Sequence, residues 1–293
     1  MKKFISNCLK ILGVFLFICI GSIILNSVLL NYKGYKISLD KNILILGDSH
    51  TEYAIDDAVL KNSINLSHSA DSYFYSYLKL RKLKKENSQI DTLLLAFSNH
   101  NLLTEYDNRW LFNTSHIKSK LRIYTDLMTF SDVVFLFKAN PSAVIQGFIE
   151  SPKYSIKLLL NGGLKERELG KFQPTQRNSL NKDIEQRKKS KKQRALEYSQ
   201  FEINHLFMIV DFCKKNDIEL IFVSTPIHPE YLKTKEKELE FFNEFYNLKL
   251  AQYRFLDYSE FNVPDESFQD LDHLNANGAK LFSNHLMKEL DKD

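Results

Sequence analysis

Ser49 lies in the stretch LILGDSH, where an apolar run ends in Gly47 and Asp48. A serine hydroxyl becomes a nucleophile only when a neighbouring base accepts its proton, and a third group has to orient that base. Asp270 and His273 stand three residues apart in DLDHLN, so both can lie on the same side of one turn. The carboxylate can then hold one imidazole nitrogen while the other faces Ser49. These residue types predict acyl transfer through a serine.

The same residues also have a structural interpretation. Asp and Ser are preferred at helix N-caps, so Asp48 and Ser49 could simply begin a helix. We expect Asp48 to cap the following helix or to order the turn in either case. Asp272 is a rival for the acid. Because it is adjacent to His273 in the chain, its side chain would point away from the imidazole in most backbone conformations. The surrounding elements have to decide between these interpretations.

Short apolar runs alternate with amphipathic stretches over most of the chain. An apolar run closed by a glycine is typical of a strand buried on both faces, and strand-helix-strand units of these lengths predict a parallel sheet. The stretch of about 105–200 is instead predicted to be a helical insertion. The expected strands are 42–47, 63–67, 90–97, 218–226 and 253–259, and the expected main helices are 71–87, 200–217, 233–248 and 275–290.

Polar residues follow the ends of the expected strands. In open α/β sheets, sites form beyond the carboxyl ends of the strands. GDSH at 47–50, NLSHSADS at 65–72 and FSNHN at 97–101 occupy such ends, and DLDHLN at 270–275 precedes the final helix. We therefore expect these four motifs to meet at one edge of the sheet.

In this order, the four motifs resemble the sequence blocks of the SGNH/GDSL hydrolases and their acyltransferase relatives. Ser49 matches the nucleophile of the first block, and Asp270 and His273 match the acid and base of the last one. Ala70 stands where the family has its oxyanion-hole glycine, and Asn99 matches the asparagine of the third block. The resemblance covers residues 41–104 and 215–290. It implies an α/β fold, which we expect to be a flavodoxin-like three-layer α/β/α sandwich with a mostly parallel sheet of four to five strands.

A tetrahedral oxyanion needs preorganised hydrogen-bond donors. The candidate donors are the backbone N–H of Ser49, the backbone N–H of Ala70 and the side-chain amide of Asn99. An alanine keeps its N–H, so Ala70 can serve if its φ is negative. A positive φ at this residue predicts an impaired oxyanion hole.

Several histidines follow the expected strand ends, which raises the question of a metal. No pair has the H-x-x-x-H spacing, and few carboxylates lie near them, so we expect neither a metal nor a cofactor. Substrate contact is the favoured role for some of them. His228 is the best candidate, because Pro226 and Pro229 fix its loop. The predicted substrate-binding residues are His50, His100 and His228.

The N-terminal segment from Ile11 to Leu30 contains 20 residues without a charge, which is enough to cross a bilayer. Lysines at positions 2, 3 and 10 precede it and favour an N-in, C-out orientation. A cleaved signal peptide is the rival, but the segment is long for one and no small-x-small cleavage site follows. The sequence therefore predicts a single-pass membrane anchor and linker over 1–40 and an extracytoplasmic domain over 41–293.

The composition excludes several classes of protein. With 44% hydrophobic and 26% charged residues, the 293-residue chain is typical of globular proteins. A net charge of +4 is too small for a dedicated nucleic-acid binder. The cysteines, at positions 8, 19 and 213, form no Cys-x-x-Cys motif, which excludes a zinc knuckle and a thioredoxin-type site.

The expected function is that of a serine esterase or O-acyltransferase with an acyl-Ser49 intermediate. The resemblance and the predicted anchor imply acylated small molecules or cell-envelope or exported polysaccharide as substrates, and a possible membrane acyl-donor partner. A non-catalytic binding or assembly subunit on the same fold is the alternative. A structural membrane protein with accidental motifs is a third interpretation.

Overall fold

The computed structural model describes residues 2–31, 35–160, 169–176, 179–189 and 196–292. The chain divides into two compact units. The first comprises Met1–Tyr35 and Leu111–Glu168, and the second comprises Lys36–Trp110 and Leu169–Asp293. This division differs from the predicted one, which placed a single domain from residue 41 onward. It arises because helices of the expected insertion pack on one another and on the N-terminal helix.

The second unit is built on a sheet of five strands in which every pairing is parallel. The strands are β1 (Ile43–Leu46), β2 (Ser63–Asn65), β3 (Thr92–Ala96), β4 (Glu219–Ser224) and β5 (Arg254–Asp257). Their order, β2-β1-β3-β4-β5, is the order found in flavodoxin-like doubly wound folds. The predicted α/β class with a parallel sheet is confirmed.

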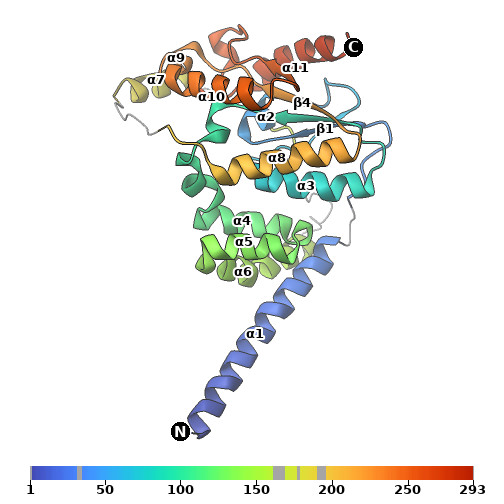
Figure 1. The fold of residues 1–293 in the computed structure, drawn as a ribbon, viewed down its shortest axis with the longest axis vertical. Helices are drawn as coiled ribbons and strands as arrows, with labels where there is room; N and C mark the ends of the chain where they lie inside the picture. Colours follow the sequence, from blue (N-terminus) through green and yellow to red (C-terminus); the bar gives the residue numbers. More distant parts are fainter. Residues whose placement is uncertain (1, 32–34, 161–168, 177–178, 190–195, 293) are drawn as a thin grey trace. The chain divides into compact units, whose positions relative to one another are not determined.

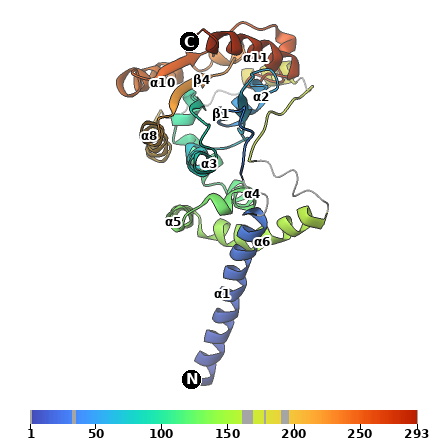
Figure 2. The same cartoon turned by 90° about the vertical axis from the view of Figure 1, so that its right-hand side faces the viewer.

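Helices cover both faces of this sheet. On one face lie α3 (Tyr73–Glu86) and α8 (Gln200–Lys215), and on the other lie α2 (Ser49–Ala54) and α11 (Ala276–Leu290) (Figures 1 and 2). Successive side chains of a strand point to opposite faces. Ile45 of β1 therefore joins the core cluster of Phe282 and Leu286 from α11, while its fully buried neighbours Leu44 and Leu46 face the α3 side.

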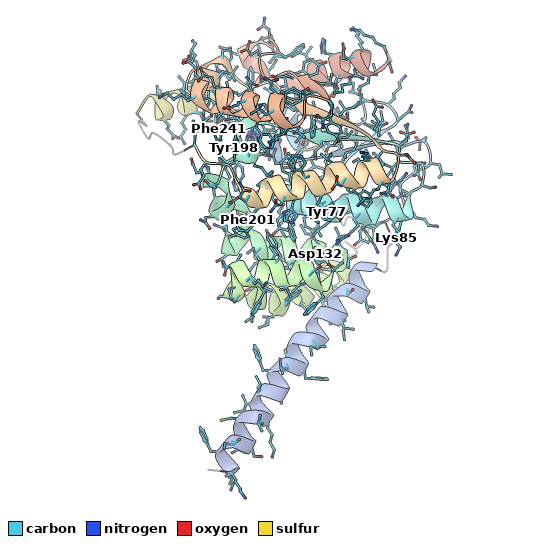
Figure 3. All side chains as sticks on the ribbon, viewed as in Figure 1. Tyr77, Lys85, Asp132, Tyr198, Phe201 and Phe241 are labelled. Carbon is cyan, nitrogen blue, oxygen red and sulfur yellow. The ribbon has the colours of Figure 1, made fainter. Side chains whose placement is uncertain are left out.

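The remaining helices of this unit are α7 (Leu180–Lys189), α9 (Pro229–Leu232) and α10 (Glu236–Lys249), with the short helices η1 (Asn99–Leu102), η2 (Asp107–Leu111) and η5 (Asp265–Ser267). Of these, α10 packs against β5, because Phe242 and Tyr246 contact the Phe255 ring and the Tyr246 hydroxyl donates to the Tyr253 carbonyl at 3.0 Å. Tyr198, just before α8, stacks on Phe241 of α10 with ring centroids 3.8 Å apart (Figure 3). The next residue, Ser199, donates its N–H to the Leu102 carbonyl at 2.8 Å. These contacts hold η1 in place after β3.

The first unit is helical in its described residues. It contains α1 (Lys2–Asn31), α4 (Thr114–Tyr124), η3 (Thr125–Leu127), α5 (Phe130–Ala139) and α6 (Pro141–Leu160). The predicted anchor segment, Ile11–Leu30, is helical as part of α1, which also includes Lys2, Lys3 and Lys10. Among the described residues, no helix has both the length and the apolar character needed to cross a membrane, so the predicted spanning helix is not found.

Candidate active site

Ser49 is the first residue of α2, directly after the end of β1. Gly47 is required between them, because a Cβ there would lie 2.3 Å from Cβ of Ala96 on the neighbouring strand β3. Asp48 is the N-cap, and its carboxylate accepts the N–H of His50 at 2.9 Å. The predicted capping role of Asp48 is therefore confirmed. The tight turn holds the Ser49 side chain at the carboxyl edge of the sheet.

Asp270 and His273 lie in the loop between η5 and α11. The Asp270 carboxylate accepts the N–H groups of Asp272 and His273, both at 2.9 Å, which closes the local turn. The His273 carbonyl accepts the N–H of Gln269 at 2.9 Å, and an antiparallel bridge joins Phe268 to Leu274. The loop thus orients the carboxylate and the imidazole toward each other.

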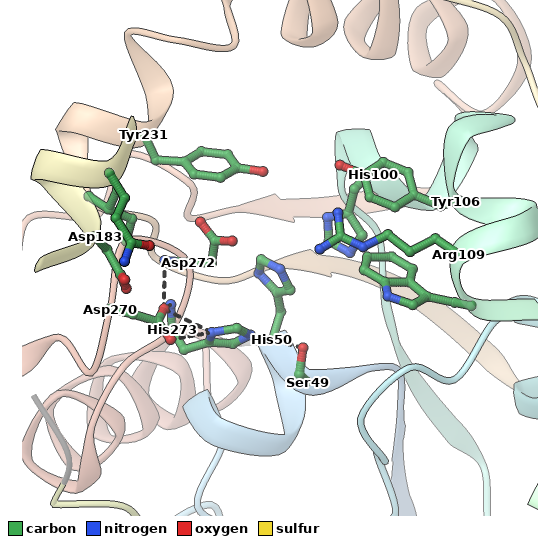
Figure 4. A pocket seen from close by; sticks show the side chains of 13 residues that line it. Ser49, His50, His100, Tyr106, Arg109, Asp183, Tyr231, Asp270, Asp272 and His273 are labelled. Carbon is green, nitrogen blue, oxygen red and sulfur yellow. Dashed lines mark hydrogen bonds and ion pairs between the residues drawn. The ribbon is translucent and has the colours of Figure 1, made fainter. Parts of the chain in front are cut away.

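The three expected residues come together in one hydrogen-bonded line. Nδ1 of His273 lies 2.9 and 3.1 Å from the two carboxylate oxygens of Asp270, and its Nε2 lies 2.9 Å from Oγ of Ser49. Figure 4 shows Asp270, His273 and Ser49 in this order along one side of the pocket. A neutral His273 with its proton on Nδ1 can accept the Ser49 hydroxyl proton at Nε2.

Asp270 and His273 shift the pKa values of each other. Burial raises the pKa of Asp270, but the hydrogen bond and the charge of His273 outweigh it and lower the pKa to about 2. Burial lowers the pKa of His273, but the hydrogen bond and charge of Asp270, with the charges of Asp272 and Asp48, raise it above its ordinary value. Asp270 therefore stays ionised at neutral pH, and His273 is a stronger base than a free histidine.

Ala70 lies in the loop between β2 and α3, next to the Ser49 turn. The N–H of His68 donates to the Gly47 carbonyl at 3.1 Å, and the hydroxyl of Thr51 donates to Oγ of Ser67 at 2.8 Å. These two bonds attach the Ala70 loop to the beginning of α2.

The φ of Ala70 is +57°, in the left-handed region that favours glycine. The condition of a negative φ is therefore not met, and an alanine pays about 1–2 kcal/mol for this conformation. The sign of φ sets the strain and leaves the N–H in place. Within the described residues, the N–H groups of Ser49 and Ala70 have no hydrogen-bond acceptor. Ser49 lines the pocket, whereas the positive φ of Ala70 meets the condition under which an impaired oxyanion hole is predicted.

A buried ion pair lies directly beside Ala70. The ammonium of Lys79, on α3, pairs with the Asp71 carboxylate and donates to the Leu66 carbonyl, and both charged side chains are fully buried. A buried pair of this kind leaves an uncompensated charge when one partner is removed. Lys79 therefore holds both ends of the loop that carries the Ala70 N–H.

The predicted role of the Asn99 side chain is not supported. Its amide donates to the Glu238 carboxylate at 3.1 Å, and Asn99 lines a second cavity of about 390 Å³ with Ser224 and Asp257. The reason is local: η1 begins at Asn99, and its tight turn directs successive residues to different sides. His100, the next residue, lines the Ser49 pocket instead.

The rings of His50 and His100 are stacked beside Ser49, and the His273 ring is tilted against His50. The ring centroids of His50 and His100 lie 4.4 Å apart, and those of His50 and His273 lie 5.0 Å apart. Nε2 of His100 lies 2.7 Å from the Asp48 carboxylate, and Nδ1 atoms of both His50 and His100 are buried without a hydrogen-bond partner. Burial lowers the pKa of His50 well below its ordinary value, with a further contribution from His100, so His50 is neutral.

The group able to offer metal ligands in the described residues is Asp48, His50 and His100. The oxygens of Asp48 already have hydrogen bonds. One accepts the His50 N–H, and the other accepts the Asn101 amide at 2.9 Å and contacts His100. These hydrogen bonds tie the group to the turn at the beginning of α2.

His228 is not among the residues that line the Ser49 pocket, so its predicted substrate contact is not supported. Its Nδ1 accepts the N–H of Glu230 at 3.2 Å at the N-cap of α9, and its Nε2 lies 3.3 Å from the Asp265 carboxylate. The fixed loop between Pro226 and Pro229 thus serves helix capping. The backbone N–H of His228 donates to the Leu271 carbonyl at 3.1 Å, which ties the His228 loop to the loop that contains Asp270 and His273.

Comparison with known proteins adds one finding. The model of an uncharacterised protein family matches residues 171–293 of this chain. The match includes Asp270 and His273, and it begins after Ser49 in the chain. No curated protein matches the chain.

The pocket around Ser49 has a volume of about 460 Å³ and contains residues that the sequence did not single out. They come from η2, α7 and the region of α9, where no strand end marked a site. The aromatic and basic cluster YDNRW at 106–110 was the available signal, since Trp110 is the single tryptophan of the chain. The additional lining residues are Tyr106, Arg109, Trp110, Asp183, Gln186 and Tyr231, and Leu271 and Asp272 of the DLDHLN motif also line the pocket.

Proposed function

We propose that this protein is a serine esterase or O-acyltransferase of the SGNH/GDSL type. The observation that carries the proposal is the 2.9 Å contact between His273 Nε2 and Ser49 Oγ, with Asp270 on the other imidazole nitrogen. A nucleophile, a base and an orienting group in hydrogen-bond reach are the general requirement for covalent acyl transfer.

In the first half-reaction, Ser49 Oγ attacks the carbonyl carbon of an ester while His273 takes the hydroxyl proton. The N–H groups of Ser49 and Ala70 donate to the developing oxyanion, where losing one donor typically costs about 2.7–4 kcal/mol. The C–O bond of the ester then breaks, and His273 returns the proton to the leaving alkoxide. The product is an acyl-Ser49 intermediate.

In the second half-reaction, an acceptor hydroxyl loses its proton to His273 and attacks the acyl carbon. The C–O bond to Ser49 breaks, and the serine oxygen regains a proton from His273. Water as acceptor gives an esterase, and a sugar hydroxyl gives an O-acyltransferase. The proposal also includes cell-envelope polysaccharide as substrate, an extracytoplasmic site of action and a membrane acyl donor. These three parts rest on the sequence alone.

A fluorophosphonate probe tests the nucleophile. We expect the wild-type protein to be labelled covalently, Ser49→Ala to be unlabelled, and His273→Ala to be labelled at a strongly reduced rate. Ser131→Ala, at an exposed serine of α5, is the matched control and should label like the wild type. Unlabelled wild-type protein with a cooperative thermal transition would refute the catalytic proposal.

Hydrolysis and transfer are separated by the fate of an acetyl group. Release of acetate from an acetyl ester is measured with and without an excess of a sugar acceptor. Formation of the acetylated sugar at the expense of acetate supports a transferase, and acetate release that the sugar leaves unchanged supports an esterase.

The alternative is a non-catalytic binding or assembly subunit on this fold. It is favoured by two observations, the Asn99 amide bonded to Glu238 and the left-handed φ of Ala70. This alternative predicts ligand binding without any probe labelling at Ser49.

A further inference from the structure

The pocket around Ser49 has two further walls of opposite chemical character. One wall consists of Tyr106, Arg109 and Trp110 from the segment at η2, and the other includes Asp183 and Gln186 from α7. Figure 4 shows Arg109 on one side of the pocket and Asp183 and Asp272 on the other. The reaction derived above uses none of these side chains, so their role lies in recognition.

Arg109 is held beside an aromatic pair. The rings of Tyr106 and Trp110 stack with centroids 4.4 Å apart, and the guanidinium carbon of Arg109 lies 5.8 and 5.5 Å from them. His100 contacts both rings edge-on, at 5.9 and 5.6 Å, so the wall is connected to the Asp48–His100 pair. Contacts of this kind with aromatic faces orient an arginine without consuming its N–H donors.

The N–H donors of Arg109 are available to a ligand. Among the described residues, the Arg109 guanidinium has no hydrogen bond or ion pair. The buried Asp48 carboxylate is not its partner, because Asp48 bonds to His50, His100 and Asn101. A planar guanidinium binds carboxylate and phosphate groups in a bidentate manner. Arg109 is exposed, so its guanidinium can be approached by a ligand from solvent.

The opposite wall carries the opposite charge, so the two sides of the pocket differ electrostatically. Asp183 and Asp272 are carboxylates, and Asp270 is already bonded to His273. A negative group is repelled from this side and attracted to Arg109, while hydroxyl groups can donate to Asp183 and to the amide oxygen of Gln186. The arrangement suits a polyhydroxylated ligand with an anionic group at one end.

We propose that the pocket selects an acidic carbohydrate ester, with a carboxylate or phosphate of the sugar bound by Arg109. The inference rests on the proposed function for the acyl chemistry at Ser49, but the binding step does not require that chemistry. The anionic group sits at the wall formed by Tyr106, Arg109 and Trp110, and the sugar hydroxyls face Asp183 and Gln186. Arg109 is the specificity-determining residue.

The test uses full-length Ser49→Ala protein, in which binding is measured without turnover. Trp110 is the only tryptophan of the chain and lies in this wall, so its fluorescence reports the site directly. The ligands are methyl glucoside, methyl glucuronoside and methyl glucoside 6-phosphate, followed by fluorescence and by calorimetric titration. The two anionic ligands distinguish a carboxylate from a phosphate requirement.

We expect at least one anionic ligand to bind about 10-fold or more tightly than methyl glucoside, a difference of about 1.4 kcal/mol. Because the attraction is between charges, high salt should reduce the preference. Arg109→Gln should abolish it, and Arg109→Lys should keep part of it. Arg81→Gln, at an arginine that lies over Tyr77 on α3, is the matched control and should keep the full preference.

Equal affinities for neutral and anionic ligands would overturn the inference, as would a preference that Arg109→Gln leaves intact. Failure of all three ligands to bind by calorimetry would overturn it as well. Arg109→Gln is also made in protein that retains Ser49, and fluorophosphonate labelling of this variant shows that it keeps a folded site. Labelling without anion preference refutes only the inference, and anion preference without labelling refutes only the acyl chemistry.

Discussion

At the scale of single residues, the proposed reactivity of Ser49 depends on His273, and that of His273 depends on Asp270. The serine hydroxyl is an ordinary alcohol until its proton has an acceptor 2.9 Å away. The acceptor in turn is fixed by two contacts to one carboxylate. Ala70 adds a different kind of dependence to the proposal, because this candidate donor stands in a backbone conformation that an alanine adopts only under strain.

The raised pKa of His273 has a consequence for the pH profile. Only neutral His273 can accept the Ser49 proton, so activity falls as the pH drops through its pKa. We expect the acidic limb of kcat/KM to have its midpoint above the ordinary histidine value of about 6.5. Asp270 has a pKa of about 2 and stays ionised over this range.

Asp270→Asn removes the charge that raises the His273 pKa. The acidic limb should move to lower pH, and the plateau should fall by roughly 10³–10⁴-fold because the imidazole loses its orientation and tautomer. The measurement is kcat/KM against pH for both proteins on an acetyl ester. An acidic limb at the same pH in both would contradict the assignment of Asp270.

A second prediction concerns the strain at Ala70. Ala70→Gly keeps the N–H and relieves the left-handed strain, but it increases the entropy of the unfolded chain. We expect unchanged labelling of Ser49 and a stability gain of about 0–1 kcal/mol. Ala70→Val, with a branched side chain at φ +57°, should lose both stability and labelling. Thermal unfolding and labelling rates measure the two effects, and a Gly variant that no longer labels would contradict this view.

At the scale of elements, the active-site loops are held together by an extended connecting segment, residues 169–176. Lys171 N–H donates to the Ser67 carbonyl at 3.1 Å, and Gln173 N–H donates to the Glu52 carbonyl of α2 at 2.9 Å. The Thr175 carbonyl accepts the N–H of Ala276 at the beginning of α11, at 2.8 Å. One segment therefore touches the loop of Ala70, the helix of Ser49 and the helix that follows His273.

Gly170 allows this segment to approach the Ala70 loop. Its φ is +147°, and a Cβ there would lie 2.2 Å from the carbonyl oxygens of Leu66 and Ser67. Gly170→Ala should reduce stability by about 2 kcal/mol or more and should slow labelling of Ser49, since backbone atoms have to move. Gly13→Ala in α1, where a Cβ meets nothing within 4 Å, is the control. Wild-type stability and labelling of the Gly170 variant would contradict the role of the segment.

At the scale of the whole molecule, every residue of the proposed chemistry belongs to the second unit. Ser49, Ala70, Arg109 and His273 all lie within Lys36–Trp110 or Leu169–Asp293. The first unit has its own helical packing, in which α4 and α5 contact α6 and α6 contacts α1. The residues of the proposed site therefore all come from one of the two units.

This separation predicts that the second unit carries the chemistry by itself. A chain of residues 36–110 joined to 169–293 by a flexible Gly/Ser linker should unfold cooperatively and should label at Ser49. Loss of labelling in a chain that still unfolds cooperatively would show that the first unit contributes to the site. Circular dichroism on heating and probe labelling are the two measurements.

The sequence alone predicted the elements of the sheet and the three residues of the proposed acyl chemistry. Buried strands are continuous apolar runs of limited length, and the parallel sheet follows from their alternation with amphipathic helices. Ser49 after β1 and Asp270 with His273 before α11 are defined by residue type and short spacing. These are local properties, so one chain without any structure was sufficient to place them.

The tertiary structure decided what depends on direction and on distant contacts. Whether Asn99 or His100 enters the pocket depends on a single turn at the start of η1, which no periodicity reports. Arg109 and Asp183 become two walls of one pocket only because segments far apart in the chain meet there. The grouping of residues 111–168 with the N-terminal helix likewise follows from packing. Side-chain direction after a strand and long-range packing are properties of the folded chain, because both are set by neighbours that sequence spacing does not identify.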